Sequence, residues 1–338
     1  MAFVCKRHYT FQLALGQCIC FSYNNNFILS AMRSKSLSLF WMICLVALAA
    51  GCTAPRSVIH SGKVTPQGQF KAGVNFGGNI ASEPISQLDD ITKAAVDAIA
   101  DRDTVFYDEQ VDVFSKALVS YALDPVGPTF DFYLRYGVAP RVDVGYKFAS
   151  GVHVFDAMYQ FMGALGTPQN PGQGGQWYGS VGLQYAGQSS GIVDKLLLDR
   201  LTSVFSFTAQ RRDIVIPLVF SKSFGVEEEI GNISFGAVYN HTFVKYGFEP
   251  GRIFKKVAGE SVKVEGLMEK NSFPSYGLFV NGKIGFKHIY VLPALTMYYQ
   301  NYGTYKFLES REVSFSGITI IPSIGLQANF GGGRGKRR

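Results

Sequence analysis

Apolar and polar residues alternate along most of the chain from about residue 68 onward. In the first such stretch, Phe70, Ala72, Val74 and Phe76 alternate with Lys71, Gly73, Asn75 and Gly77. A period of two is that of a β-strand whose two faces meet different surroundings. The same alternation returns at 130–137 and at 142–148, on either side of a short turn at 138–141, which predicts a β-hairpin.

The alternation predicts about ten strands in all. Beyond these three, the candidates are 152–163, 176–186, 213–223, 232–248, 275–286, 288–302 and 315–330. Many of these stretches exceed the usual strand length of about five or six residues and match the 9–11 residues that a tilted strand needs to cross a bilayer. The pattern predicts an all-β fold, an antiparallel transmembrane β-barrel of about ten strands (eight to twelve) over residues 68–330.

The polar face of the strands decides between a membrane barrel and a soluble one. In the last stretch, Ile318, Ile320, Pro322, Ile324, Leu326, Ala328 and Phe330 share one face, and Thr319, Ser323, Gly325, Gln327 and Asn329 share the other, with Ile321 as an exception. A soluble barrel would carry many Lys and Glu residues on its outer face. Glycine and small polar residues indicate a crowded polar lumen instead, with lipid on the apolar side.

The connections between strands give an orientation, because barrels of this kind have short periplasmic turns and longer outer loops. A periplasmic first strand puts the long connections, about 81–127, 187–212, 249–274 and 303–314, mostly on the outer side. The first of them contains Ile91, Ala94, Ala95, Ala98 and Ile99, then Val111, Phe114 and Leu118, at helical spacing. We therefore expect a helical insertion over about 85–121, which either caps or enters the barrel or lies on its surface.

Composition supports the barrel and excludes other classes. The chain has 37 glycines, 14% aromatic residues and only 17% charged residues. Its formal charge of +7 includes Lys6, Arg7, Arg33 and Lys35 near the start, leaving 28 basic against 25 acidic residues from Cys52 onward. Part of that small excess lies in a basic tail, 331–338, so no basic stripe suits a nucleic acid.

A targeting signal precedes the barrel. Residues 32–51 combine two basic residues, an apolar run and small residues before Cys52, in the order of a signal peptide. The ending Leu48-Ala49-Ala50-Gly51-Cys52 resembles the lipobox of bacterial lipoproteins, which implies acylation of Cys52 by chains such as palmitate. The alternative is an ordinary signal peptide cut near Ala50. Residues 52–67 are expected to form a lipidated tether, and residues 1–31 are an extension without an assigned role.

Two further segments resemble bacterial outer-membrane β-barrel proteins. They are FYLRYGVAPRVDVGYKF at 132–148 with FDAMYQF at 155–161, and the final polar-glycine-aromatic pattern that ends at Phe330. The latter resembles the signal read by the outer-membrane assembly machinery, although the tail GGGRGKRR continues beyond it. The resemblance implies localisation in the cell outer membrane, anchored at Cys52. It implies outer-membrane lipid and the assembly and lipoprotein-processing machinery as partners.

The chain offers little catalytic chemistry. His153, His241 and His288 lack a Gly-x-Ser-x-Gly partner and do not form a metal-ligand spacing. No cysteine follows Cys52, which excludes a disulfide scaffold or a cysteine zinc site in the mature chain. We therefore expect no enzyme, no cofactor and no metal. The acidic run Glu227, Glu228 and Glu229 is expected to form a solvated loop.

The candidate functional residues are charges on the polar face of the strands. They are Asp131, Arg135, Asp143, Lys147, Asp156 and Lys283. Charges inside a barrel must be paired or hydrated, so they predict either a network that plugs the lumen or a water-filled pore. The leading hypothesis is a narrow pore or a small-solute binding barrel. The alternatives are a structural or surface-interaction protein acting through its outer loops, or an outer-membrane hydrolase.

Overall fold

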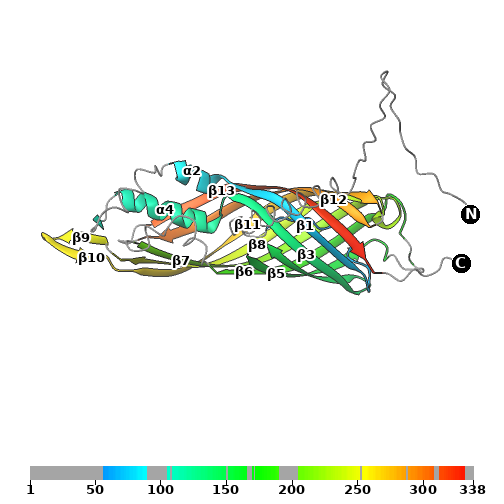
Figure 1. The fold of residues 1–338 in the computed structure, drawn as a ribbon, viewed down its shortest axis with the longest axis horizontal. Coiled ribbons are helices and arrows are strands. Elements are labelled where there is room, and N and C mark those ends of the chain that lie inside the picture. Colours follow the sequence, from blue (N-terminus) through cyan, green and yellow to red (C-terminus); the bar gives the residue numbers. More distant parts are fainter. Residues whose placement is uncertain are drawn as a thin grey trace, which may run out of the picture. The chain divides into compact units, whose positions relative to one another are not determined.

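The computed structural model describes residues 56–89, 105–106, 109–149, 151–165, 170, 172–189, 205–251, 253–286, 288–307 and 312–331. They fold around a closed antiparallel barrel of ten strands (Figure 1), which confirms the predicted fold class. The barrel strands are β1 (Phe70–Ala81), β3 (Gly127–Ala139), β4 (Val142–Ala149), β5 (Val152–Met162), β6 (Trp177–Ser189), β7 (Phe205–Phe224), β8 (Gly231–Pro250), β11 (Leu267–Phe286), β12 (Ile289–Lys306) and β13 (Glu312–Phe330).

Each strand pairs with its chain neighbours in the barrel, and β1 closes the ring against β13. The closing register places Phe70 opposite Phe330 and Val74 opposite Leu326. All ten predicted stretches are strands, and several extend further than the alternation indicated. The longest, β7, β8 and β11, have 20 residues each, whereas β4 has only eight. The wall of the barrel is therefore much taller on the side of β7, β8 and β11.

The two ends of the barrel differ. At one, called the turn end, β1 begins, β13 finishes and short turns join β3 to β4 and β7 to β8; the latter contains the short helix η1 (Val226–Glu228). The other, called the helix end, holds α2 (Ser82–Asp89), α4 (Glu109–Leu123) and a small sheet of β2 (Val105–Phe106), β9 (Ile253–Val257) and β10 (Glu260–Lys263). Most short turns lie at one end and most long connections at the other, as the alternation predicts. The tight turn from β4 to β5 at the helix end and the longer connection from β5 to β6 at the turn end are the exceptions, and both were expected from the sequence.

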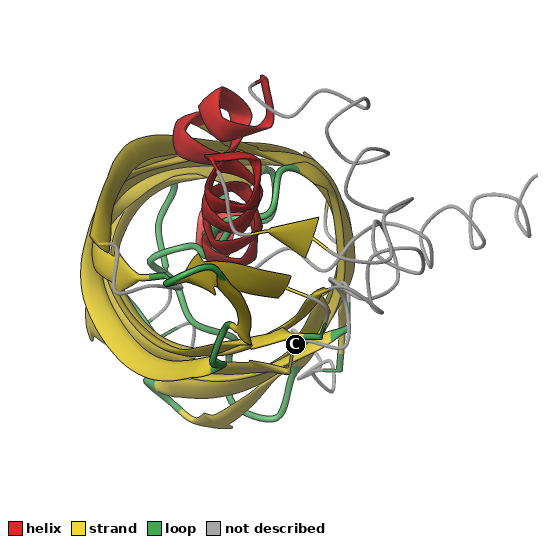
Figure 2. Cartoon of the chain, turned by 90° about the vertical axis from the view of Figure 1, so that its left-hand side faces the viewer, coloured by secondary structure: helices red, strands yellow, loops and turns green. Residues whose placement is uncertain are grey.

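The predicted helical insertion after the first strand is confirmed as α2 and α4. Viewed along the barrel from the helix end, α4 lies within the mouth (Figure 2). Its residues Leu118, Val119 and Leu123 are buried in the apolar core at that end, so this helix enters the barrel. The predicted helix around Ile91–Ile99 lies outside the described residues. No helix in the described part of the chain has the length and apolarity to cross a membrane.

The polarity of the long strands inverts along their length. On β8 the outward residues Ile233, Phe235 and Phe243 are apolar and exposed, but the next outward residue toward the helix end is Lys245. The inward residues change from polar to apolar in the same direction along the strand. Ser234, Asn240 and Thr242 are buried polar residues, and Val244, Tyr246 and Phe248 are buried apolar ones. The barrel thus has two halves. One, called the membrane half, is apolar outside and largely polar inside, with a buried apolar cluster that includes Val238. The other, called the outer half, has the polarity of a soluble domain.

The outer half has a conventional hydrophobic core. Aromatic side chains from five strands surround α4, and several pairs pack in tilted or edge-to-face geometry with centroids 5.1–6.3 Å apart, as aromatic rings prefer. They are Phe207, Tyr246, Phe248, Phe273, Tyr302, Tyr305 and Phe315, joined by Phe307 just beyond β12. This core fixes α4 in the mouth of the barrel.

Candidate functional site in the barrel lumen

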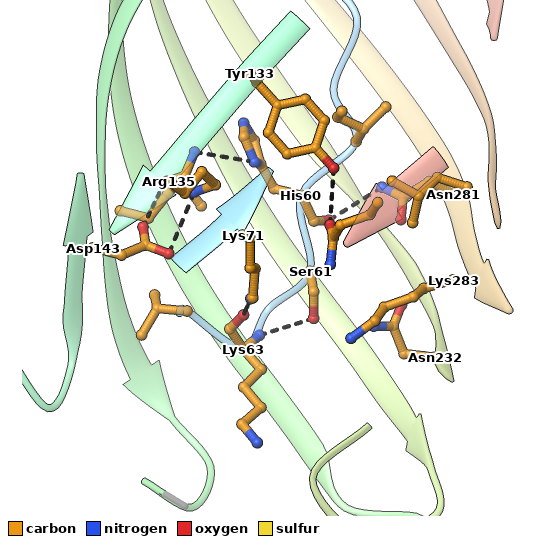
Figure 3. A pocket seen from close by; sticks show the side chains of 15 residues that line it. His60, Ser61, Lys63, Lys71, Tyr133, Arg135, Asp143, Asn232, Asn281 and Lys283 are labelled. Carbon is orange, nitrogen blue, oxygen red and sulfur yellow. Dashed lines mark hydrogen bonds and ion pairs between the residues drawn. The ribbon is translucent and has the colours of Figure 1, made fainter. Parts of the chain in front are cut away.

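The polar lumen of the membrane half contains a segment of the protein's own chain. Residues 56–67 run inside the barrel ahead of β1, with Arg56 toward the helix end and Pro66 at the turn end; this stretch is called the lumen segment. Figure 3 shows its backbone passing between the strands at His60, Ser61 and Lys63. These residues belong to the region predicted as a tether. A polar composition suits a hydrated linker and a chain bonded to a polar lumen equally well, so it could not distinguish the two.

Backbone hydrogen bonds tie the lumen segment to strands around the barrel. The Val58 amide donates to Thr296 Oγ1 on β12 at 3.2 Å. Asn281 on β11 donates to the His60 carbonyl at 3.1 Å, and the Gly62 amide donates to Ser221 Oγ on β7 at 3.1 Å. The wall side chains thereby supply partners that an extended chain would otherwise lack in a dry interior.

A buried charge cluster holds the Arg56 end. The Arg56 guanidinium forms an ion pair with Asp124, the residue that follows α4, and donates to Gln300 on β12. Asn79 on β1 also donates to Asp124, at 2.5 Å, and Tyr302 on β12 does so at 3.0 Å. Both Arg56 and Asp124 are fully buried. Removing one of them would leave the other charge uncompensated, which is the costly outcome for a buried pair.

A second charge cluster holds the segment at the turn end. Lys63 pairs with Glu227 at 3.1 Å, and Ser61 and Lys283 both bond to the Glu228 carboxylate, Lys283 at 3.4 Å. The prediction of a solvated acidic loop is therefore wrong for Glu228, which is buried by the lumen segment. Burial alone would raise the pKa of Glu228, but the neighbouring lysines, Lys283 foremost, outweigh it and lower that pKa below its ordinary value.

The six predicted lumen charges all lie on the inner face of the wall. Arg135 on β3 forms ion pairs with Asp143 on β4 and Asp156 on β5. The other three have partners elsewhere in the lumen. Asp131 accepts from Asn75 on β1 at 2.5 Å, Lys147 donates to the Ser57 carbonyl at 3.5 Å, and Lys283 pairs with Glu228. Asp143 also accepts from the Thr65 amide at 2.6 Å, which connects the charged wall to the lumen segment.

A small cavity remains beside the lumen segment (Figure 3). It has a volume of about 30 Å³ and is lined by His60 and Ser61 together with Lys71, Asn232, Lys283 and other wall residues. A water molecule occupies about 30 Å³ in the liquid. The cavity therefore has room for one or two waters, which could hydrate the lysines but could not carry a solute past the segment.

Several residues of the lumen site were not predicted. Arg56 and Lys63 lie upstream of the first strand and carry no periodic signal, and Asp124 lies outside the alternation. Arg211 and Asp213 could have been found, because their two-residue spacing places both on one strand face, where they form a buried ion pair at 2.8 Å. Lys71 lies on the polar face of the first predicted stretch, but no acidic residue occurs in that stretch to indicate an ion pair.

The histidines are separated in the structure. His153 and His241 lie on the outward face of the barrel, bonded to Tyr146 and Tyr239, and His288 is exposed at the turn end. His60 lies in the lumen between Arg135 and Gln184. No cluster of three potential metal ligands occurs in the part of the chain that the structure describes. Cys52 and the tail residues 332–338 lie outside the described residues.

The sequence matches no protein-family model and no curated protein. Solved structures similar to the barrel include Ail of Yersinia pestis, at 9% identity and a TM-score of 0.26, covering 78% of this chain and 99% of that one. A major outer membrane protein of Thermus thermophilus has 8% identity and a TM-score of 0.31, and the match covers 77% of this chain and 99% of that one. The outer membrane protease OmpT of Escherichia coli has 8% identity and a TM-score of 0.33, and the match covers 78% of this chain and 94% of that one. At these values the likenesses carry no argument about activity.

Proposed function

We propose that this protein is an outer-membrane β-barrel, lipid-anchored through Cys52, that forms a narrow pore closed by its own lumen segment. The membrane setting rests on the apolar outward band of the membrane half, where Ile324 and Leu326 are more than half exposed. A soluble surface would not expose such a continuous band. The turn end faces the periplasm and the helix end faces outward, since barrels of this kind have their short turns inside.

The observation that carries the closed pore is the bonding of the lumen segment to the wall. Its hydrogen bonds involve side chains of β1, β4, β7, β11 and β12, and its ion pairs join Arg56 to Asp124 and Lys63 to Glu227. Val58 and Val64 also pack against buried apolar wall residues. If the segment left, the polar groups that it bonds would line a passage inside the ring of ten strands, beside the apolar residues that it covers. The polar part of the wall is therefore suited to water as well as to the segment.

Deletion of the lumen segment tests the pore. In planar bilayers, a variant lacking residues 57–65 should show discrete ion conductance, whereas the full mature chain should be nearly silent. A control deletion of nine residues at the helix end, residues 255–263 of β9, β10 and their turn, should leave the bilayer silent. Silence of a lumen-segment deletion that still shows the heat-dependent gel mobility of a folded barrel would contradict the pore.

A disulfide offers a reversible version of the same test. Ser61 Oγ and Ser221 Oγ lie 3.2 Å apart, one on the lumen segment and one on β7. The mature chain has no cysteine after Cys52, so a Ser61→Cys, Ser221→Cys variant can form one new bond inside the barrel. Oxidised protein should stay closed under acid or voltage that opens the wild type, and a reductant should restore opening. The single Ser221→Cys variant is the control.

A second candidate function is surface interaction through the outer half. The observation favouring it is that β7, β8 and β11 continue past the apolar band and enclose an apolar core around α4. Removing the exposed tip of β9 and β10, residues 256–263, should then abolish adhesion to an outer partner without changing conductance. We also propose that the protein is not an enzyme, because the described histidines are apart and mostly on the outer surface.

The lipid anchor is tested separately from the pore. If Cys52 is acylated, mass spectrometry of the mature amino terminus should find the added acyl chains, and Cys52→Ala should accumulate unprocessed precursor. An unmodified terminus beginning near Gly51 or Cys52 would contradict the anchor while leaving the pore proposal intact.

A further inference from the structure

A group of basic residues lies on the outward face of the barrel at the boundary between its two halves. The group consists of Arg212 on β7, Lys245 on β8 and Lys270 on β11, all exposed, and is called the basic rim. Strand register brings them together. Lys270 is directly opposite Lys245, and Arg212 is opposite Phe243, one step diagonally from Lys245.

The arrangement of the basic rim is unfavourable unless an anion is present. Like charges directly opposite on neighbouring strands repel each other. No ion pair between described residues includes any of the three. The nearest outward acid on β8 is Glu249, four residues further toward the helix end, and Glu269 is within 3.9 Å of Lys306 instead. The rim therefore offers three positive charges to a partner outside the protein.

Aromatic side chains lie immediately on the membrane side of the basic rim. His241 packs against Phe243 with ring centroids 4.7 Å apart, and Tyr239 packs against Tyr276 at 5.5 Å. Aromatic girdles of this kind mark the level of lipid headgroups in transmembrane barrels. Their position places the basic rim at the headgroup level on the outward-facing side of the membrane.

An apolar groove continues below the aromatic residues on the same strands. It has a volume of about 540 Å³ and is lined by residues of β7, β8, β11, β12 and β13, including Ile216, Ala237, Tyr276, Leu278 and Met297. Lys245 lies six positions along β8 from Tyr239 at the groove. At about 3.3 Å per residue and a tilt of about 40°, this is about 15 Å along the membrane normal, a distance that fits within one leaflet.

We propose that the basic rim and the groove form one binding site for an anionic lipid of the outward-facing leaflet. Its phosphate lies among Arg212, Lys245 and Lys270, and an acyl chain occupies the groove. Phosphate oxygens match lysine and arginine donors, and the lipid's anchorage in the bilayer supplies the chain at the correct depth. A free phosphate would satisfy the rim but leave the groove without an occupant, so the lipid is the better match for the combined surface.

Native mass spectrometry of the detergent-solubilised full mature chain tests the site. Phosphatidylglycerol and phosphatidylcholine with identical acyl chains are titrated in parallel, and retained lipid is counted. Wild type should retain phosphatidylglycerol in preference. The Lys245→Gln, Lys270→Gln variant should lose that preference by about 30-fold, since each of the two lysines near a headgroup contributes about 1 kcal/mol. Ala237→Trp, which fills the groove, should reduce retention of both lipids.

The matched control is Lys222→Gln with Lys263→Gln, which removes the same charge from exposed lysines on β7 and β10, away from the rim. It should bind like the wild type. Equal retention of the two lipids by wild type, or equal loss in the control and the rim variant, would overturn the proposal. Full displacement of phosphatidylglycerol by inorganic phosphate would also overturn it by indicating a free-anion site. If the Lys245→Gln, Lys270→Gln variant fails to fold, the single variant Arg212→Gln is titrated with the two lipids in its place.

Discussion

The membrane half and the outer half of this barrel are built from the same strands and stabilised in opposite ways. In the membrane half, the interior groups Ser234, Asn240 and Thr242 are fully buried and polar. A few residues further along β8, the interior consists of Val244, Tyr246 and Phe248. The first interior is filled by an extended segment of the chain and the second by a helix.

The difference follows from what surrounds each half. If lipid surrounds the membrane half, as proposed, it contributes no hydrophobic driving force for closing the barrel. There the wall and the lumen segment are joined largely by hydrogen bonds and ion pairs, together with an apolar cluster around Val58 and Val64. Water surrounds the outer half, which can then gain stability by burying aromatic side chains. Under the proposed pore, water would replace the polar partners of a released lumen segment, so the membrane half is the half suited to gating.

The largest expected effect concerns the aromatic core. Phe248 is fully buried, and its ring lies 5.1 Å from Phe207 and 5.9 Å from Phe307. Phe248→Ala should lower the free energy of unfolding by about 3–5 kcal/mol. Ser234→Ala, at an equally buried position in the membrane half, should cost only about 1 kcal/mol. Urea unfolding of barrels folded into liposomes measures both, and equal costs would remove the distinction between the halves.

The outward faces provide the next test. Ile324 is 56% exposed on the apolar band, and Ile324→Arg should cost about 2–4 kcal/mol if it faces lipid near the bilayer centre. Thr208 is exposed on the outward face of the outer half, and Thr208→Arg should change stability by less than about 0.5 kcal/mol. The fraction of protein that inserts into liposomes reports both changes. Similar tolerance at the two positions would mean that the band does not face lipid.

The charge network of the membrane half should be sensitive to loss of a single partner. Arg135→Ala leaves Asp143 and Asp156 without their shared cation and should cost about 1–3 kcal/mol, with a lower heat-unfolding temperature. Arg135→Lys retains the charge but loses the paired donors, so an intermediate effect is expected. Glu249→Ala, on the exposed face of the outer half, is the control. If the Arg135→Ala variant is as stable as the wild type and as silent in bilayers, the ion-pair network is not needed to stabilise the barrel or to close the pore.

The smallest effect is a pH dependence at the turn end. Because the pKa of Glu228 is lower in the folded protein than its ordinary value, its charged form stabilises the closed state above that ordinary value. This stabilisation is lost as the pH falls through the lowered pKa, so acid should favour release of the lumen segment. Glu228→Gln should weaken the closed state by about 1 kcal/mol near neutral pH and flatten the acid response. Bilayer conductance between pH 7 and pH 3 would measure this, and the outer core should show no matching change.

Much of the barrel could be predicted from local pattern. The alternation of Ile318 to Phe330 with smaller polar residues identifies both faces of β13, and Ile321, the exception, is buried in the lumen as the strand period requires. The hairpin of β3 and β4 likewise places Arg135 and Asp143 on one face of neighbouring strands. A period of two is a property of the strand itself, so these features need no knowledge of distant residues.

Only the tertiary structure decided what fills the barrel. Nothing in the order of residues 56–67 indicates that Arg56 lies beside Asp124 and Gln300, which are far away in sequence. The outer ends of β7 and β11 were missed for a related reason: their inward residues become apolar where α4 enters, so the two faces of each strand exchange polarity and the alternation of apolar and polar residues no longer marks the strand. On β8 the prediction, 232–248, reached almost to the end of the strand. Sequence determined the faces of each strand because the strand's geometry is local. The lumen's occupants depend on closure of the ring, which sets the positions of all ten strands together.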